Sequence, residues 1–387
     1  MNKKKEDFDV QAMNNDDPAN NIESTDESSD PEIKRPFDPK KIDMTLKSLI
    51  IDSLIKRMAS NPSRIDLNTE FQRRGNLWSE TDQSRLIESL LVRIPLPAFY
   101  FDGTNDEKWK VVDGLQRLTT LKRFIIDRTL KLTNLEFLKD KYENCGFDKL
   151  PAYLQTRIEE SQVTVYIINP GTPDDVKYNI FKRINTGGLM LTAQEIRHAL
   201  NQGIPADFVK ELADLPEFHQ ATHGILKDHK RMEDRDFVTR FIAFYHQGYD
   251  NYQSELDDFL NNSLRQLNNL PKDQLMTIKK DFSRAMVGAH RIFEDYAFRK
   301  RSPYEHRERK RPLNKALFDT WAVNLALLSD EELHKLVLRK DAVNSKFIES
   351  MKDENFRDSI SLATGKITAV KTRFLKIKEL IQGVLTS

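Results

Sequence analysis

The residues with the clearest capacity for chemistry lie in one short segment, Val111–Arg117. Apolar β-branched residues precede Asp113, and leucines at helical spacing follow it, so the pattern predicts a strand that passes into a helix at Gly114. The first helical turn carries unpaired N–H groups and the positive end of the helix dipole, which favour an anion. Arg117 offers donors suited to phosphate, Gln116 lies beside it, and Asp113 could hold Mg²⁺ or orient water. The segment therefore predicts a site for a nucleotide polyphosphate or a nucleic-acid backbone.

Several other chemistries are not supported. No phosphate-binding P-loop motif occurs, and Gly365–Thr368 lacks the upstream glycine of that motif. His219, His223 and His229 cluster in the sequence, but they form no HExxH pair and lack the downstream residues of a His-Asn-His nuclease. The single cysteine, Cys145, excludes an internal disulfide and a multi-thiolate zinc site.

Four sequence blocks follow one another along the chain: Phe71-Gln72-Arg73 with Trp78, Asp113 to Leu121, Phe181 to Gly188 with Gln194 to Arg197, and Lys230 to Phe237 with Arg240-Phe241. Taken in this order, the blocks resemble a large prokaryotic family related to ParB and sulfiredoxin. That family carries an Asp-Gly-Gln-Gln-Arg signature and includes the N-terminal part of GmrSD-type, modification-dependent restriction systems. One position departs from the signature: Leu115 replaces a Gln, and its spacing from the following leucines favours a core-facing side chain.

The resemblance implies a domain that binds, and in several members hydrolyses, a nucleoside triphosphate in defence against foreign DNA. It implies that Asp113 positions Mg²⁺ or water, and that Gln116 positions the water or a phosphate. Arg117 and the remaining site residues would bind or neutralise phosphate; these are Arg73, Gly114, Arg183, Asn185 and Arg197. The pattern around the last three also has a purely structural interpretation, because Gly187-Gly188 suits a helix end and Thr192 to Glu195 has the spacing of a capping box.

Two alternatives remain open from the sequence. The same pocket could cleave a DNA phosphodiester directly, as has been proposed for ParB-like domains. The chain could instead be a non-catalytic module that binds DNA or protein. Because the chain shows no nuclease motif, the leading interpretation adds a partner nuclease; the base of the nucleotide and the oligomeric state are not predicted.

The elements that must position these residues fall into three parts. Residues 1–33 carry a net charge of −7 and few apolar side chains, so we expect a disordered acidic tail over 1–41. An α+β domain of the ParB/sulfiredoxin-like type is expected over 42–202, and an all-α domain over 203–387. Within the first domain we expect a helix over 46–58, a short strand at 64–67, a helix capped by Ser79, a hairpin formed by 98–101 and 109–112, a strand over 163–168, and helices over 174–185 and 193–201.

Beyond residue 203 only helical periodicities occur, over 205–213, 233–247, 252–266, 272–298, 313–327, 331–350 and 365–384. Residues 299–315 carry a net charge of +6. This run is either a solvated loop between helices or a patch in which Arg307, Arg309 and Arg311 contact nucleic-acid phosphates, and the second is the prediction to be tested. No apolar run is long enough for a membrane span, and charged residues make up 31% of the chain, which favours a cytoplasmic protein.

Overall fold

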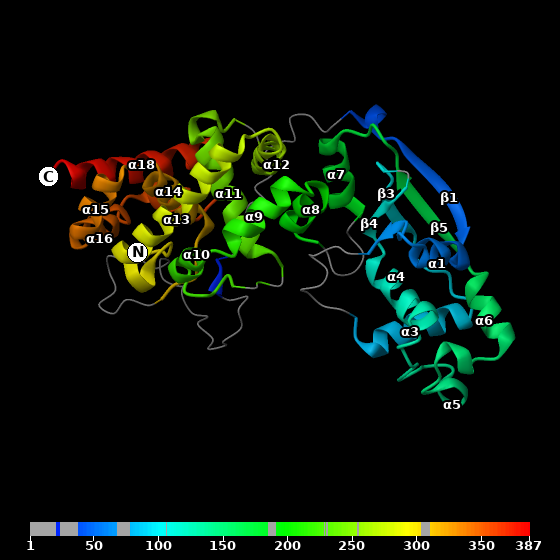
Figure 1. Ribbon diagram of the computed structural model, residues 1–387. Coiled ribbons are helices and arrows are strands. Elements are labelled where there is room, and N and C mark those ends of the chain that lie inside the picture. The colour runs from blue at the N-terminus through cyan, green and yellow to red at the C-terminus, as the bar shows by residue number, and fades with distance from the viewer. Residues whose placement is uncertain are drawn as a thin grey trace, which may run out of the picture. The chain divides into compact units, whose positions relative to one another are not determined.

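The computed structural model describes residues 21–23, 38–67, 78–105, 107–184, 191–227, 229, 231–253, 255–302 and 310–387. The chain divides into two compact units (Figure 1). The α/β unit comprises Glu32–Gln202 and Lys230–Met232. The helical unit comprises Met1–Pro31, Gly203–His229 and Glu233–Ser387. Each unit has a hydrophobic core of its own.

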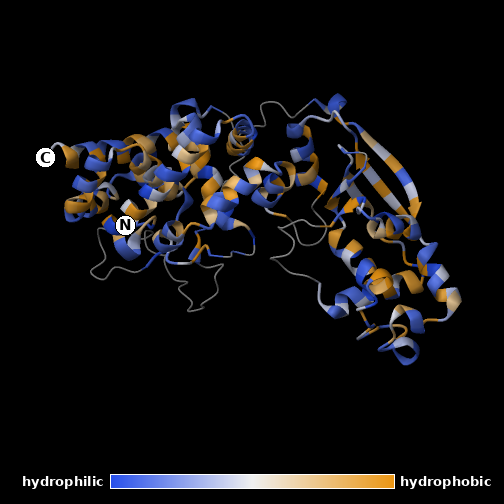
Figure 2. Cartoon of the chain, viewed as in Figure 1, coloured by the Kyte–Doolittle hydropathy of each residue, from blue (hydrophilic) through white to orange (hydrophobic). Residues whose placement is uncertain are grey.

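The α/β unit is built on a five-stranded mixed sheet with the order β1-β5-β3-β4-β2. The strands are β1 (Met44–Ile50), β2 (Ile65–Asp66), β3 (Phe99–Asp102), β4 (Trp109–Asp113) and β5 (Gln162–Ile168). The expected hairpin is confirmed, because β3 pairs antiparallel with β4. Strand β5 lies between an antiparallel neighbour, β1, and a parallel one, β3. Buried and more exposed residues alternate along β5 up to Ile167, as expected for a strand that buries one face, and Figure 2 shows bands of hydrophobic and hydrophilic residues along the strands at this side of the sheet.

Helices pack against the sheet in two separate cores. They are α1 (Ile51–Ala59), α3 (Glu80–Leu91), α4 (Leu115–Leu121), α5 (Lys139–Tyr142), α6 (Ala152–Glu159), α7 (Asp174–Ile184) and α8 (Ala193–Leu200). Side chains of α1, α3, α4 and α6 join Phe99, Phe101 and Val165 in the larger core. Side chains of α7 and α8 pack with Val112 and Ile168 in a smaller core. The expected caps are confirmed, because Ser79 begins α3 and Thr192 begins α8, each with a reciprocal capping box.

The predicted helix over 46–58 is wrong in its first half. Met44–Ile50 is the edge strand β1, and the helix begins only at Ile51. Leu46, Leu49 and Ile50 fit a helical spacing, but the backbone of this segment pairs residue by residue with β5, from Met44 opposite Ile168 to Ile50 opposite Gln162. Long-range pairing has overridden the local periodicity.

The helical unit contains no strand longer than an isolated bridge among its described residues, in agreement with the sequence. Its helices are α9 (Ile204–Ala213), α10 (Pro216–Ala221), α11 (Glu233–Gln247), α12 (Leu256–Leu267), α13 (Lys272–Phe293), α14 (Lys315–Ala326), α15 (Asp330–Leu338), α16 (Lys340–Ser350), α17 (Glu354–Ser359) and α18 (Ile367–Leu385). The helix expected over 331–350 is two helices that meet at Arg339. The sequence did not predict the short helices α10 and α17, because six residues hold less than two turns of periodicity.

The predicted layout of a mixed α/β part followed by a helical part agrees with this architecture. Two pieces of the expected disordered tail have defined structure: Asn21–Glu23 pairs with the helical unit, and Pro39–Lys41 forms a short 3-10 turn. The rest of the tail lies outside the described residues. Across the part of the chain that the structure describes, no helix combines the length and apolar character needed to span a membrane.

Candidate functional site

The site begins with a shift in the β3–β4 register. Phe101 pairs with Val111, but Tyr100 pairs with Asp113, so Val112 is an extra residue in β4. Trp109 and Val111 enter the larger core. Without the shift, the alternation of side chains along β4 would point Asp113 into the same core as Trp109 and Val111. The bulge instead leaves the Asp113 carboxylate half-buried, with 27% of its side chain exposed.

Gly114 makes the turn from β4 into α4. Its φ is +100°, in the left-handed region, and it is the N-cap of α4. A Cβ at this position would lie 2.5 Å from Cδ1 of Phe99 and 3.3 Å from Nη2 of Arg117. Both the backbone angle and the close packing therefore require glycine.

We expect Gly114→Ala to destabilise the α/β unit by more than the roughly 1–2 kcal/mol that left-handed strain alone costs, because the methyl group also displaces Phe99. Gly171→Ala is the matched control, since Gly171 has φ +93° and open space around its Cα. Urea denaturation of both variants measures the difference. Equal losses would show that the Phe99 contact adds nothing.

Arg117 is buried and held by protein acceptors. Its Nη2 donates to Oδ2 of Asp113 at 2.6 Å and to the carbonyl of Ala98 at 3.2 Å, and its Nη1 donates to the carbonyl of Pro97. The guanidinium carbon also lies 4.7 Å from the centre of the Phe99 ring. Arg117 thus fastens Asp113 to the segment that leads into β3.

Burial sets the protonation behaviour of this pair. Desolvation raises the pKa of the Asp113 carboxyl above its ordinary value, although the Arg117 charge and the Gly114 N–H oppose the shift. Desolvation likewise lowers the pKa of Arg117, and Asp113 opposes that shift. Arg117 therefore holds the Asp113 carboxylate in place, and the pKa of this carboxyl is higher than that of an exposed aspartate.

Gln116 connects two of the four sequence blocks. Its Oε1 accepts a hydrogen bond from the backbone N–H of Trp78 at 3.3 Å. The Trp78 carbonyl accepts from Nε2 of Gln83 at 2.7 Å, which fixes the entry into α3. Arg73, in the same block as Trp78, lies outside the described residues. Leu115 is buried in the larger core, which confirms its expected core-facing orientation.

Two tyrosines beside Asp113 were not singled out from the sequence. The Tyr100 and Tyr166 rings stack with centroids 4.9 Å apart and an interplanar angle of 10°. Burial raises the pKa of Tyr100, and the nearby Tyr166 and Asp113 raise it further. The predicted strand over 98–101 already implies that Tyr100 faces the other side of the sheet from Phe99 and Phe101. Its position opposite Asp113 depends on the register of the sheet, which the sequence does not give.

Residues 51–202 match the family described as GmrSD restriction endonuclease, N-terminal domain. Over these residues the chain is similar to a GmrSD-type N-terminal domain. The match contains the Asp113–Arg117 turn and ends at residue 202, where the main segment of the α/β unit also ends. No curated protein and no solved structure matches the chain.

The third block of the GmrSD-type domain has mainly structural contacts. Arg183 lies exposed in the last turn of α7, and Asn185 is outside the described residues. Arg197 is buried, and its Nε donates to Oε1 of Gln194 at 2.9 Å. Glu195 completes the capping box of α8 and also accepts from Nε and Nη2 of Arg231 at 3.1 and 3.0 Å. The third and fourth blocks therefore meet at the Glu195–Arg231 ion pair.

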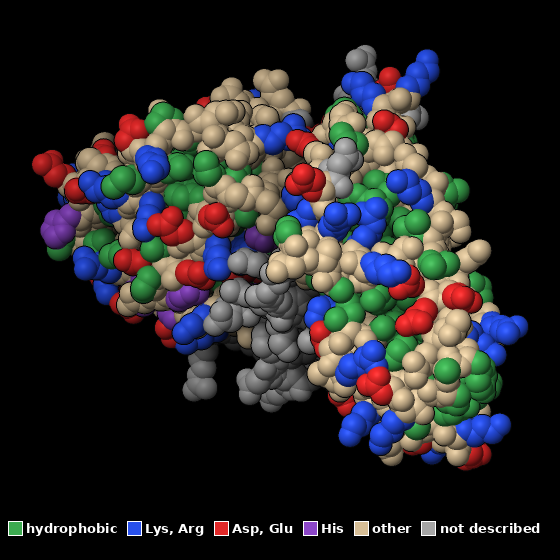
Figure 3. Space-filling view, turned by 45° about the vertical axis from the view of Figure 1, so that its right-hand side comes forward, with side chains coloured by type: hydrophobic (Ala, Val, Ile, Leu, Met, Phe, Trp, Pro, Cys, Tyr) green, Lys and Arg blue, Asp and Glu red, His purple; other side chains and the backbone are tan. Residues whose placement is uncertain are grey.

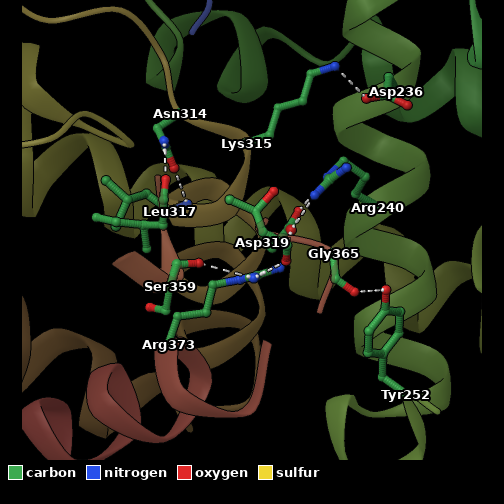
Figure 4. Close-up of polar contacts among 12 residues, drawn as sticks. Asp236, Arg240, Tyr252, Asn314, Lys315, Leu317, Asp319, Ser359, Gly365 and Arg373 are labelled. Atoms are coloured by element: carbon green, nitrogen blue, oxygen red, sulfur yellow. Dashed lines mark hydrogen bonds and ion pairs between the residues drawn. The ribbon is translucent and has the colours of Figure 1, made fainter. Parts of the chain in front are cut away.

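The remainder of the fourth block enters the core of the helical unit (Figure 4). Arg240 donates to both oxygens of Asp319, at 2.9 and 2.8 Å. Arg373 reaches Asp319 from α18 at 3.2 Å and the carbonyl of Thr364 at 2.6 Å. All three charged side chains are at most 1% exposed. Burial lowers the pKa of Arg373 to about 10, so it stays charged at neutral pH, and the network holds α11, α14 and α18 together.

Three lysines of the basic run are paired with acids. Lys300 pairs with Glu23, Lys310 with Asp295, and Lys315 with Glu233 and Asp236 at 2.8 and 2.9 Å. Arg299 is buried and donates to the carbonyl of Arg311. Arg307 and Arg309 lie outside the described residues. Figure 3 likewise shows Lys and Arg side chains interspersed with Asp and Glu on the face it displays.

The described residues contain no group of three His, Cys, Asp or Glu side chains that could hold a metal ion. Asp113 offers one carboxylate, of which Oδ2 already accepts from Arg117. Mg²⁺ often binds through one or two carboxylates together with substrate phosphates. Asp113 could therefore contribute one carboxylate oxygen to a Mg²⁺ ion that arrives with a nucleotide.

Proposed function

We propose that this protein is a component of a restriction system and that its GmrSD-type domain binds and hydrolyses a nucleoside triphosphate at the Asp113–Arg117 turn. The observation that carries the proposal is the family match across residues 51–202, which includes this turn. Support comes from the geometry, because the bulge, Gly114 and Arg117 together hold one carboxylate at the end of β4.

The contacts divide the roles within the site. Arg117 is a positioning residue, since its hydrogen bonds go to Asp113 and two backbone carbonyls. Asp113 would hold Mg²⁺ or the attacking water, and Gln116 would orient that water or a phosphate. When bound, Mg²⁺ would neutralise phosphate charge. We retain Arg73, Arg183 and Asn185 as proposed phosphate contacts, whereas the burial of Arg197 favours a supporting role in α8.

Isothermal titration with ATP, GTP, CTP and UTP, with and without Mg²⁺, tests the binding step, and phosphate release tests hydrolysis. We expect one nucleotide to bind more tightly in the presence of Mg²⁺. Binding without phosphate release would favour the non-catalytic module. No binding, together with cleavage of DNA, would favour the ParB-like phosphodiesterase.

We also propose that the protein contacts DNA through residues 299–315 and acts with a partner nuclease. The net charge of +6 in this run favours the contact, although several of its cations are already paired. Replacing Arg307, Arg309 and Arg311 together by Ala should flatten the log–log salt slope of duplex binding by up to about 2.7, at about 0.9 for each lost phosphate contact. Fluorescence anisotropy over a salt series measures it, and an unchanged slope would place any DNA contact elsewhere.

A further inference from the structure

A short piece of the acidic N-terminal region pairs with the rest of the helical unit through an isolated parallel β-bridge between Ile22 and Leu313. The N–H of Leu313 donates to the carbonyl of Asn21 at 2.8 Å, and the N–H of Glu23 donates to the carbonyl of Leu313 at 2.8 Å. Leu313 also bridges antiparallel to Arg299 on its other side. The backbone of Leu313 is therefore shared between the basic run and the acidic region.

Side chains make this contact selective for an apolar residue followed by an acid. Ile22 packs against the core of the helical unit. The Glu23 carboxylate accepts from Nζ of Lys300 through Oε1 and from Nδ2 of Asn314 through Oε2, the latter at 2.8 Å. Asn314 is fully buried, and its Oδ1 caps α14 by accepting from the N–H of Leu317 at 2.8 Å.

The contact joins Lys300 of the basic run to Glu23 of the acidic region. Lys300 is 16% exposed and belongs to the run whose net charge is +6, whereas residues 1–33 carry a net charge of −7. Docking of Ile22 and Glu23 occupies Lys300 of the basic run with a carboxylate from the acidic region. A nucleic-acid phosphate and the Glu23 carboxylate are both anions, so they would compete for Lys300.

We propose that Asn21–Glu23 is an intramolecular occupant of a strand-accepting, carboxylate-binding site and that it masks the basic run from polyanions. The masking of DNA rests on the proposed DNA contact of this run, whereas the docking itself does not. Release of the segment would free the edge of Leu313, the Lys300 ammonium and one N–H of the Asn314 amide, whose other contacts are to Ile360 and Leu317.

Two substitutions release the segment by different means. Glu23→Gln removes the carboxylate, and Ile22→Ser removes the apolar anchor without changing charge. Glu27→Gln is the matched control, because it changes the net charge of the acidic region by the same amount as Glu23→Gln. All are made in the full-length chain, and hydrogen exchange at the Leu313 amide reports docking directly.

We expect Glu23→Gln and Ile22→Ser to speed exchange at Leu313 and to bind both heparin and a short fluorescein-labelled duplex more tightly than the parent does. The duplex salt slope should steepen by about 0.9, because Lys300 becomes one more phosphate contact. Tighter heparin binding without duplex binding would support the masking and overturn the proposed DNA contact. Unchanged Leu313 exchange, or equal polyanion binding by Glu23→Gln and Glu27→Gln with no effect of Ile22→Ser, would overturn the inference.

Discussion

Asp319→Ala is expected to destabilise the helical unit by about 3–5 kcal/mol or more, the cost of leaving buried charge without its partner. The loss should lie at the upper end because two guanidinium groups, those of Arg240 and Arg373, share this one carboxylate and are both inaccessible to water. Urea denaturation followed by circular dichroism measures the change, and nucleotide titration shows whether the GmrSD-type domain survives it.

A surface ion pair provides the control for this prediction. Asp330 accepts from Arg284 at 2.7 Å, but its side chain is 75% exposed. Asp330→Ala should leave the melting temperature nearly unchanged, since exposed pairs contribute little. If the two variants melted alike, the buried network would not be what holds α11, α14 and α18 together.

Asp113→Asn is expected to bind the nucleotide yet lower phosphate release by about 10²-fold or more, the usual contribution of a positioned acid–base group. Asparagine keeps the size of the side chain and an acceptor for Arg117 but loses the charge that would hold Mg²⁺ or activate water. Single-turnover phosphate release beside isothermal titration separates the two effects. Loss of binding with unchanged release per bound nucleotide would assign Asp113 to binding alone.

The pH profile gives this site a second readout. Because burial raises the pKa of Asp113, the carboxylate that the proposed hydrolysis would require is lost at a higher pH than for an exposed aspartate. The rate of the parent protein should therefore fall, as pH decreases, through a pKa above the ordinary aspartate value. The residual rate of Asp113→Asn should not show this decrease at low pH.

Local patterns predicted much of the fold. The N-cap at Ser79, the capping box at Thr192, the hairpin and the turn at Gly114 each depend on residues close in sequence, and the structure contains all of them. Strand β1 was missed because its apolar positions fit a helix equally well, and only pairing with β5 decides between the two.

The site was predictable in its location more than in its contacts. The motif identifies Asp113 and Arg117, but the carbonyls of Pro97 and Ala98 that occupy Arg117 come from another segment. The register shift that brings Tyr100 to Asp113 leaves no mark on the composition of β4. The pairing of Lys300 with Glu23 likewise joins distant segments, so a charge count along the chain overstates the free charge of the basic run.

The Glu195–Arg231 ion pair has a consequence for how this gene can be divided. Residues 230–232 belong to the α/β unit although both flanking segments belong to the helical unit. Truncation after residue 202 would remove the Arg231 partner of Glu195, whose side chain is only 5% exposed. No single cut therefore yields either unit whole. A GmrSD-type domain produced in isolation should carry the 230–232 segment if it is to keep the Glu195–Arg231 ion pair.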